Sequence, residues 1–287
     1  MLNPVVTQSP VAVAALVRGI FSELYPGAAL TVLDRAFVDL EQYFAGQHPG
    51  FLANDLGYHN LEHTLQATVC LAQLLRGAHL AGDPHRLTPR QFELAIITAL
   101  LHDTGYLKIR SDLSGTGAKY TLTHVLRSCS FAAAYLPTLG VGSAEIAAVL
   151  AAINCTGPAN EIGRLAFTSE TDRFIGCALA TADYLGQLAA PDYPDKLERL
   201  YDEFLESDEF LGVPACKRMF QSAQDLKEKT PAFWSNFILP RLELQLERMY
   251  RYLSQPFPDG PNEYLQAIER NIAIIRQRLA DRPPSES

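Results

Sequence analysis

Residues 95–105 read AIITALLHDTG, and this stretch points to the fold of the whole chain. Its first seven residues are apolar apart from one threonine, which indicates a helix buried on all sides. His102 and Asp103 follow at the end of the run, where a charge needs a partner or a metal ion. A Thr-Pro-x-Gln signature at 88–91 starts the helix, and Gly105 is a stop signal. The sequence therefore predicts a buried helix that delivers two candidate ligands at its last turn.

A second histidine cluster lies upstream, where residues 58–63 read YHNLEH. His59 and His63 are four residues apart, so we expect them on one face of a helix from about Tyr58 to Leu75. The same residues match H-x-x-E-H, an inverted zinc-protease pattern in which Glu62 would be the general base. That alternative expects a mixed α/β fold and leaves the His-Asp pair unexplained, so we disfavour it.

A third source of ligands is the segment 175–187, which contains small and apolar residues and one carboxylate, Asp183. A lone buried aspartate is rare unless it is paired. Asp172 falls on almost the same face but has polar neighbours, so Asp183 is the favoured candidate. With His63 and the His-Asp pair it would give two imidazoles and two carboxylates. Such a mixed set with positions left for water suits Mn, Fe, Co, Zn or Mg.

The remaining sequence also predicts helices and no strand. We expect an all-α fold with one domain over 1–287, a metal-binding core at about 50–190 and a helical extension at about 191–280. Pro240 interrupts a long pattern and predicts a kink. The further helices are expected at 11–24, 31–44, 122–136, 144–154, 170–188, 194–206, 232–253 and 261–279.

Composition narrows the class of protein. A net charge of −8 argues against a sequence-independent hold on nucleic acid and against docking on anionic lipid. The sequence contains no run of 18 apolar residues, so it does not predict a membrane span. The five cysteines form no CxxC pair, so we expect them reduced and mostly buried in a cytoplasmic protein. A homodimer is left open.

The order His63, His102-Asp103 and Asp183 resembles the H…HD…D signature of the HD superfamily of metal-dependent phosphohydrolases. The stretch 58–63 further resembles the motif of the cyclic-nucleotide phosphodiesterase branch. The resemblance implies an all-helical bundle, metal binding by these four residues, and His59 as general acid. Asp103 would then be both ligand and catalytic residue, and the partner a small, nucleotide-like phosphorylated substrate. Hydrolysis of the phosphoester by metal-activated water is the implied reaction.

The chain departs from that pattern in two respects. Tyr106 stands where phosphodiesterases have a second histidine and where the HD-GYP branch has a lysine. The glutamine and aromatic clamp that phosphodiesterases use on the base are not located either. Two other functions therefore remain as alternatives. One is a di-iron oxygenase, although the missing histidine ligand argues against it. The other is a non-catalytic regulatory domain, which would be expected to have lost some of the metal ligands.

Several polar residues near these motifs have open roles. One metal ion is expected. His124 could hold a second ion with a bridging Asp103, contact a substrate phosphate, or be an ordinary residue at the start of a helix. Lys108, Arg110 and Lys119 are candidates for a phosphate-contacting lid, with solvated loop charges as the favoured interpretation. The acidic cluster Asp192–Glu209 is expected to be a solvated helix face.

Overall fold

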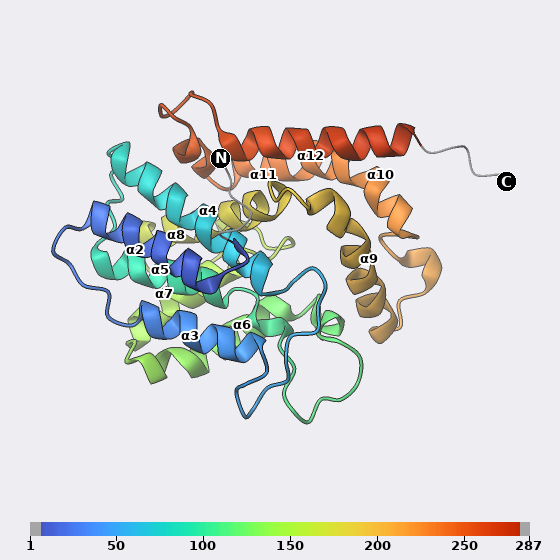
Figure 1. Cartoon of the computed structure of the whole chain (residues 1–287), viewed down its shortest axis with the longest axis horizontal. Coiled ribbons are helices and arrows are strands. Elements are labelled where there is room, and N and C mark those ends of the chain that lie inside the picture. The colour runs from blue at the N-terminus through green and yellow to red at the C-terminus, as the bar shows by residue number, and fades with distance from the viewer. Residues whose placement is uncertain (1–6, 282–287) are drawn as a thin grey trace.

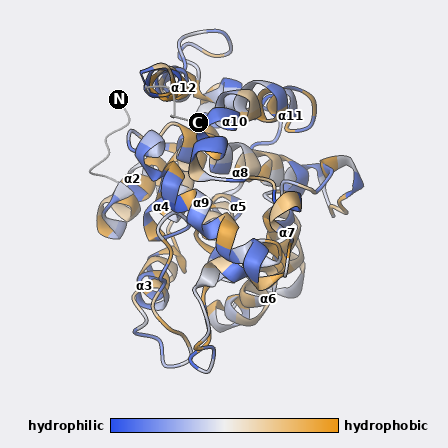
Figure 2. Cartoon of the chain, turned by 90° about the vertical axis from the view of Figure 1, so that its right-hand side faces the viewer, coloured by the Kyte–Doolittle hydropathy of each residue, from blue (hydrophilic) through white to orange (hydrophobic). Residues whose placement is uncertain are grey.

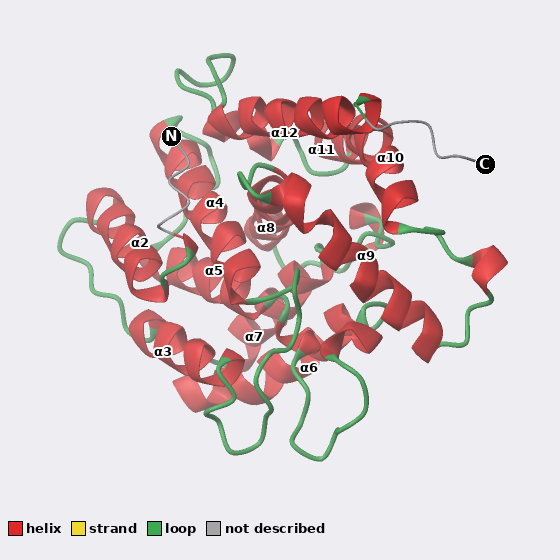
Figure 3. Ribbon diagram, turned by 45° about the vertical axis from the view of Figure 1, so that its right-hand side comes forward, coloured by secondary structure: helices red, strands yellow, loops and turns green. Residues whose placement is uncertain are grey.

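The computed structural model describes residues 7–281, and within that range the chain forms helices without a single strand element (Figure 3). The predicted all-α class is confirmed. Short 3₁₀ turns and two isolated bridges, Phe51 to Ile109 and Ser254 to Asn262, complete the fold. The α-helices are α2 Pro10–Leu24, α3 Leu33–Phe44, α4 Leu61–Leu80, α5 Pro89–Leu101, α6 His124–Tyr135, α7 Ser143–Asn154, α8 Glu170–Leu188, α9 Tyr193–Phe210, α10 Ala223–Phe233, α11 Leu239–Leu244 and α12 Glu263–Ala280.

Helices α4, α5 and α8 form the buried centre, around which the other helices pack (Figure 1). In α5 every residue from Phe92 to Leu101 is buried, as its apolar sequence predicted. Helices α4 and α8 lie directly against each other. A side chain at Gly186 would meet the backbone of Gln66 at 2.9 Å, so glycine is what permits this close approach. The three helices that carry the candidate ligands are thus also the core of the molecule.

Helix α5 begins where its sequence signature placed it. Thr88 is the N-cap, its side chain accepts a hydrogen bond from the backbone of Gln91, and Gln91 bonds back to the cap residue. This reciprocal pair satisfies two of the free amides at the helix start. The helix ends at Leu101, and a 3₁₀ turn, η1 (Thr104–Tyr106), follows at once.

The C-terminal helices α10, α11 and α12 form a layer across one side of the molecule, and α9 connects this layer to the centre (Figure 1). The kink expected at Pro240 takes the form of a π-helical turn, η6 (Trp234–Ile238), directly before α11. A π turn changes the backbone hydrogen-bonding pattern locally, and such turns are a known cause of helix kinks, as is proline. The division into a core and an extension stays a prediction.

No helix in the described range is both long and apolar enough to cross a membrane. Of the five cysteines, Cys70, Cys129, Cys155 and Cys177 are buried and Cys216 is exposed, and all are free thiols. The expectation of reduced, mostly buried cysteines is confirmed.

Candidate metal centre

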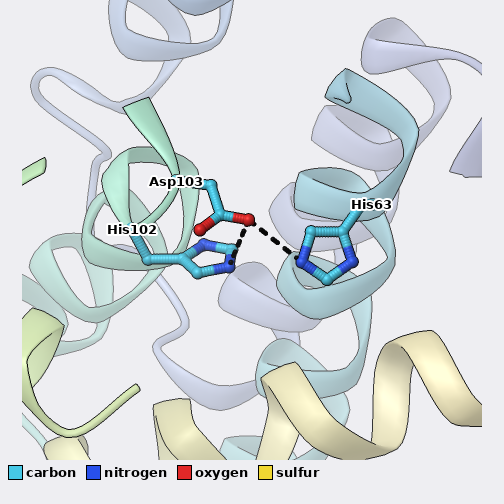
Figure 4. Close-up of side chains that lie close together, drawn as sticks. All are labelled: His63, His102 and Asp103. Atoms are coloured by element: carbon cyan, nitrogen blue, oxygen red, sulfur yellow. Dashed lines mark ion pairs between the residues drawn. The ribbon is translucent and has the colours of Figure 1, made fainter. Parts of the chain in front are cut away.

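His63, His102 and Asp103 come together at the centre of the bundle (Figure 4). Their ligand atoms all lie within 4.8 Å of one another. The Asp103 carboxylate sits between the two rings, with Oδ2 3.1 Å from Nε2 of His63 and 3.5 Å from Nε2 of His102. His63 comes from the first turn of α4, and the other two residues follow the last turn of α5. Two helices thus supply one cluster, as the sequence predicted.

Asp183 of α8 completes the cluster from a third helix. Its Oδ1 lies 3.3 Å from Nε2 of His63 and 3.5 Å from Nε2 of His102. Asp172 lies at the start of the same helix and bonds to Thr168. The structure therefore brings together the four residues that the sequence selected, and places Asp172 outside the group.

The unsatisfied atoms of this cluster match the ligand atoms of a metal ion. Nε2 of His102, Oδ2 of Asp103 and Oδ1 of Asp183 are buried and have no hydrogen-bond partner among the described residues. Buried polar groups are almost always paired, so the convergence of these atoms marks a place that could hold a cation. Nδ1 of His102 lies 2.7 Å from the carbonyl of Ala99, which fixes the proton there and leaves Nε2 free as a ligand.

The cluster is strongly coupled electrostatically. Burial alone would lower the pKa of His63, but Asp103 and Asp183 outweigh it and raise this pKa to about 10. Burial likewise opposes a charge on His102, yet the two carboxylates raise its pKa. The imidazoles in turn hold the pKa values of both aspartates below their usual range, against the effect of burial. In the metal-free protein, protonated histidines thus supply the positive charge that balances the two carboxylates.

His124 approaches the cluster from the first residue of α6. Its Nε2 lies 3.7 Å from Oδ1 of Asp103, on the oxygen that does not face the other two histidines. Its Nδ1 lies 2.6 Å from the carbonyl of Thr121, which leaves Nε2 directed at the carboxylate. Asp103 thus presents one oxygen to each side, as a bridging ligand would.

His59 lies beside the cluster but not on the helix that carries His63, so the sequence prediction of a shared helix face is wrong. Helix α4 begins at Leu61, and Asn60 in extended conformation caps it by accepting from the His63 amide at 3.2 Å. An asparagine cap was therefore taken for the interior of a helix. The two rings still lie 5.4 Å apart, because the chain turns sharply at the cap.

A buried glutamate on α9 holds His59 in place, and the sequence analysis missed it. Nδ1 of His59 lies 2.5 Å from Oε2 of Glu203, and Oε1 accepts from the Tyr58 amide at 2.7 Å. Glu203 is only 5% exposed, so the expectation of a wholly solvated acidic face over Asp192–Glu209 is wrong at this position. The sequence did contain an indication, since Glu203 follows Leu200 by three residues and lies six residues after the buried Leu197. Figure 2 shows that α9 carries both hydrophilic and hydrophobic residues.

The basic residues of the loop between α5 and α6 are engaged by neighbouring groups. Lys108 pairs with Asp55 at 2.8 Å, and Lys119 pairs with Asp112 at 2.5 Å. Both are buried, so the interpretation of these two lysines as solvated charges is wrong. Arg110 is exposed and donates to the carbonyl of Pro49 at 2.7 Å. The lid role of these residues stays a prediction.

Glu62 does not face the cluster. Its carboxylate pairs with Lys196 of α9 at 2.8 Å. Together with the all-helical fold, this contradicts the inverted zinc-protease alternative, which needs Glu62 as general base in an α/β enzyme.

Comparisons with known proteins place this arrangement in a family. A family model described as Npun_R2479-like matches residues 50–256. The chain belongs to the Npun_R2479-like family. The match includes every candidate ligand as well as Glu203. No curated protein matches the chain.

Solved structures show the same fold, and 32 of their chains match. One is the cyclic-nucleotide phosphodiesterase LmjPDEB1 in complex with IBMX. It has a TM-score of 0.59 and 14% sequence identity, over 95% of this chain and 87% of that one. The chain therefore has a fold similar to that of a helical phosphodiesterase catalytic domain.

Proposed function

We propose that this chain is a metal-dependent phosphohydrolase of the HD type that cleaves a phosphoester of a nucleotide or cyclic nucleotide. The observation that carries the proposal is the convergence of unsatisfied ligand atoms from His102, Asp103 and Asp183 beside His63. The phosphodiesterase-like fold supports the same reaction class. The chain retains each of the four core ligands, which disfavours a purely regulatory role.

A divalent cation at this cluster would supply a water molecule of lowered pKa and would polarise a phosphoryl oxygen. The four side chains that would hold it are two imidazoles and two carboxylates. This mixed set suits Mn, Fe, Co, Zn or Mg. Oδ1 of Asp103 and Nε2 of His124, which are 3.7 Å apart, are the atoms that would hold a second ion.

The chain also provides a proton donor beside the cluster. Because a carboxylate only accepts hydrogen bonds, Glu203 fixes a proton on Nδ1 of His59 and leaves Nε2 to exchange a proton with substrate. The side chain of His59 is 16% exposed, whereas that of His63 is 5% exposed. His59 is thus reached from the solvent side and is suited to protonate the leaving oxygen.

Metal analysis combined with a phosphoester screen tests the proposal. The full chain is stripped with a chelator, reloaded with each candidate metal, and assayed on cyclic nucleotides, nucleoside monophosphates and aryl phosphodiesters. His102→Ala should lose both metal and activity. His59→Ala should keep the metal and lose about 10²–10⁴-fold in kcat with poor leaving groups. His85→Ala serves as the control, since His85 pairs with Asp83 outside the cluster.

Two results would overturn the proposal. The first is a metal-free protein with an active His102 variant. The second is oxygen consumption by an iron-loaded sample without phosphoester hydrolysis, which would favour the oxygenase alternative.

A further inference from the structure

The ring of Tyr106 packs against two histidines of the candidate site. Its centroid lies 4.7 Å from that of His59, with 17° between the ring planes, and 4.7 Å from that of His124, with 14° between the planes. The two imidazoles are themselves 6.4 Å apart and inclined by 30°. All three rings are therefore nearly parallel.

Both imidazoles stack on the phenol ring in an offset arrangement. Stacked aromatic rings are separated by about 3.5 Å, so centroid distances of 4.7 Å mean that each imidazole is displaced sideways from the centre of the phenol ring. Offset stacking is a favoured arrangement of aromatic rings. Tyr106 therefore contacts both histidines through the face of its ring.

The ring of Tyr106 is itself held firmly. Tyr106 is 2% exposed and packs with Leu56 and Ala118 in a small apolar cluster. The preceding amide, that of Gly105, donates to Oγ of Ser128 at 2.9 Å and fixes η1 against α6. The ring therefore cannot move without disrupting packed neighbours.

The two histidines are held at their edges by other groups. Glu203 holds His59 through Nδ1, and the carbonyl of Thr121 holds His124 through Nδ1. One edge hydrogen bond still lets an imidazole tilt about it. A ring stacked on the imidazole removes that freedom, so the edge and face contacts together define the direction of each Nε2.

We propose that Tyr106 is a positioning residue that holds the imidazoles of His59 and His124 in their working orientation. The inference rests on the proposed function, because His59 must lie within hydrogen-bond reach of the leaving oxygen to protonate it. It accounts for the aromatic residue three positions after Asp103. Since the contact is through the ring face, the phenyl group rather than the hydroxyl carries the role.

The kinetic test compares Tyr106→Leu with Tyr106→Phe on two phosphodiesters. With an alkoxide leaving group, which needs protonation, the leucine variant should lose about 10–100-fold in kcat with little change in KM. With a nitrophenolate leaving group the loss should stay below about threefold, since little protonation is needed. Tyr106→Phe should restore the parental ratio of the two rates and leave the metal content unchanged. Tyr135→Leu, another buried tyrosine outside the site, is the control.

A double variant separates positioning from general damage. In a His59→Ala background, Tyr106→Leu should cause no further loss with the alkoxide substrate, because both changes act through one proton transfer. Equal losses for both leaving groups, or a full second loss in the double variant, would overturn the proposal.

A spectroscopic test remains available if the leucine variant does not fold. In the unaltered protein loaded with Zn²⁺, ring protons of His59 and His124 should resonate upfield, because they lie over an aromatic face. Tyr106→Phe should preserve these shifts. Unshifted resonances would refute the stacked arrangement. If the shifts are present but no phosphoester is hydrolysed, the proposed function fails while the ring geometry stands.

Discussion

At the scale of single residues, the candidate site depends on which atom of each side chain is already occupied. His102 and His124 give Nδ1 to backbone carbonyls, and His59 gives Nδ1 to Glu203. In each case Nε2 is left for chemistry. Hydrogen bonds on the far side of a ring fix its orientation and its protonation before any ligand arrives.

The pKa of His63 makes metal binding dependent on pH. In the metal-free protein this pKa is raised from 6.5 to about 10. The proton therefore stabilises the fold fully below pH 6.5, and this contribution disappears as the pH rises through about 10. A metal ion must displace the proton, so its apparent affinity should rise with pH across the same window.

Calorimetric titration in two buffers of different ionisation enthalpy measures the protons released when metal binds. We expect release of one proton or more at pH 7. The temperature at the midpoint of thermal unfolding of the metal-free protein should decrease as the pH rises from 6.5 to 10. Metal binding without proton release would contradict the pKa assigned to His63.

At the scale of elements, the turn between α5 and α6 determines whether the site forms. A side chain at Gly105 would lie 1.9 Å from the carbonyl oxygen of His124 and 2.7 Å from the Ser128 amide. Glycine is therefore required here for close approach of η1 to α6. The stop signal predicted at Gly105 does not end α5, because that helix already ends at Leu101 and Gly105 lies in the 3₁₀ turn that follows. This approach brings His124 to Asp103.

Gly105→Ala should destabilise the protein by about 1–3 kcal/mol through overpacking, with reduced binding of a second metal ion because His124 is displaced. Urea unfolding measures the first effect and metal stoichiometry the second. Gly19→Ala is a matched control in α2, where an added Cβ meets nothing within 4 Å and helix propensity should improve. Equal stabilities of the two variants would contradict the close contact.

At the scale of the whole molecule, the site combines segments that are distant in the chain. His59 and Glu203 are 144 residues apart in the chain, and the packing of α9 brings Glu203 into contact with His59. The same helix holds the loop before α6, since Glu206 binds Thr116. Helix α9 therefore lies beyond the core predicted at 50–190 yet supports the candidate site.

Glu203→Gln should keep the metal but reduce kcat about tenfold or more with poor leaving groups, because an amide can donate as well as accept and no longer fixes the orientation of the His59 ring through Nδ1. Glu206→Gln is the matched control on the same helix, and it should leave the dependence on leaving group unchanged. Rates with both substrate types, together with metal content, measure the effect. If both variants behave alike, Glu203 has no specific role in orienting His59.

The sequence by itself determined the helical class, the buried α5 and the four residues of the candidate metal centre. These features follow from local rules, because apolar periodicity defines helices and a charged group in an apolar segment needs a partner. It misplaced the start of α4, since an asparagine cap and a helical residue differ only in backbone conformation. Only the tertiary structure decided the pairing of His59 with Glu203, the burial of Lys108 and the stacking on Tyr106, because contacts between distant segments depend on how helices pack.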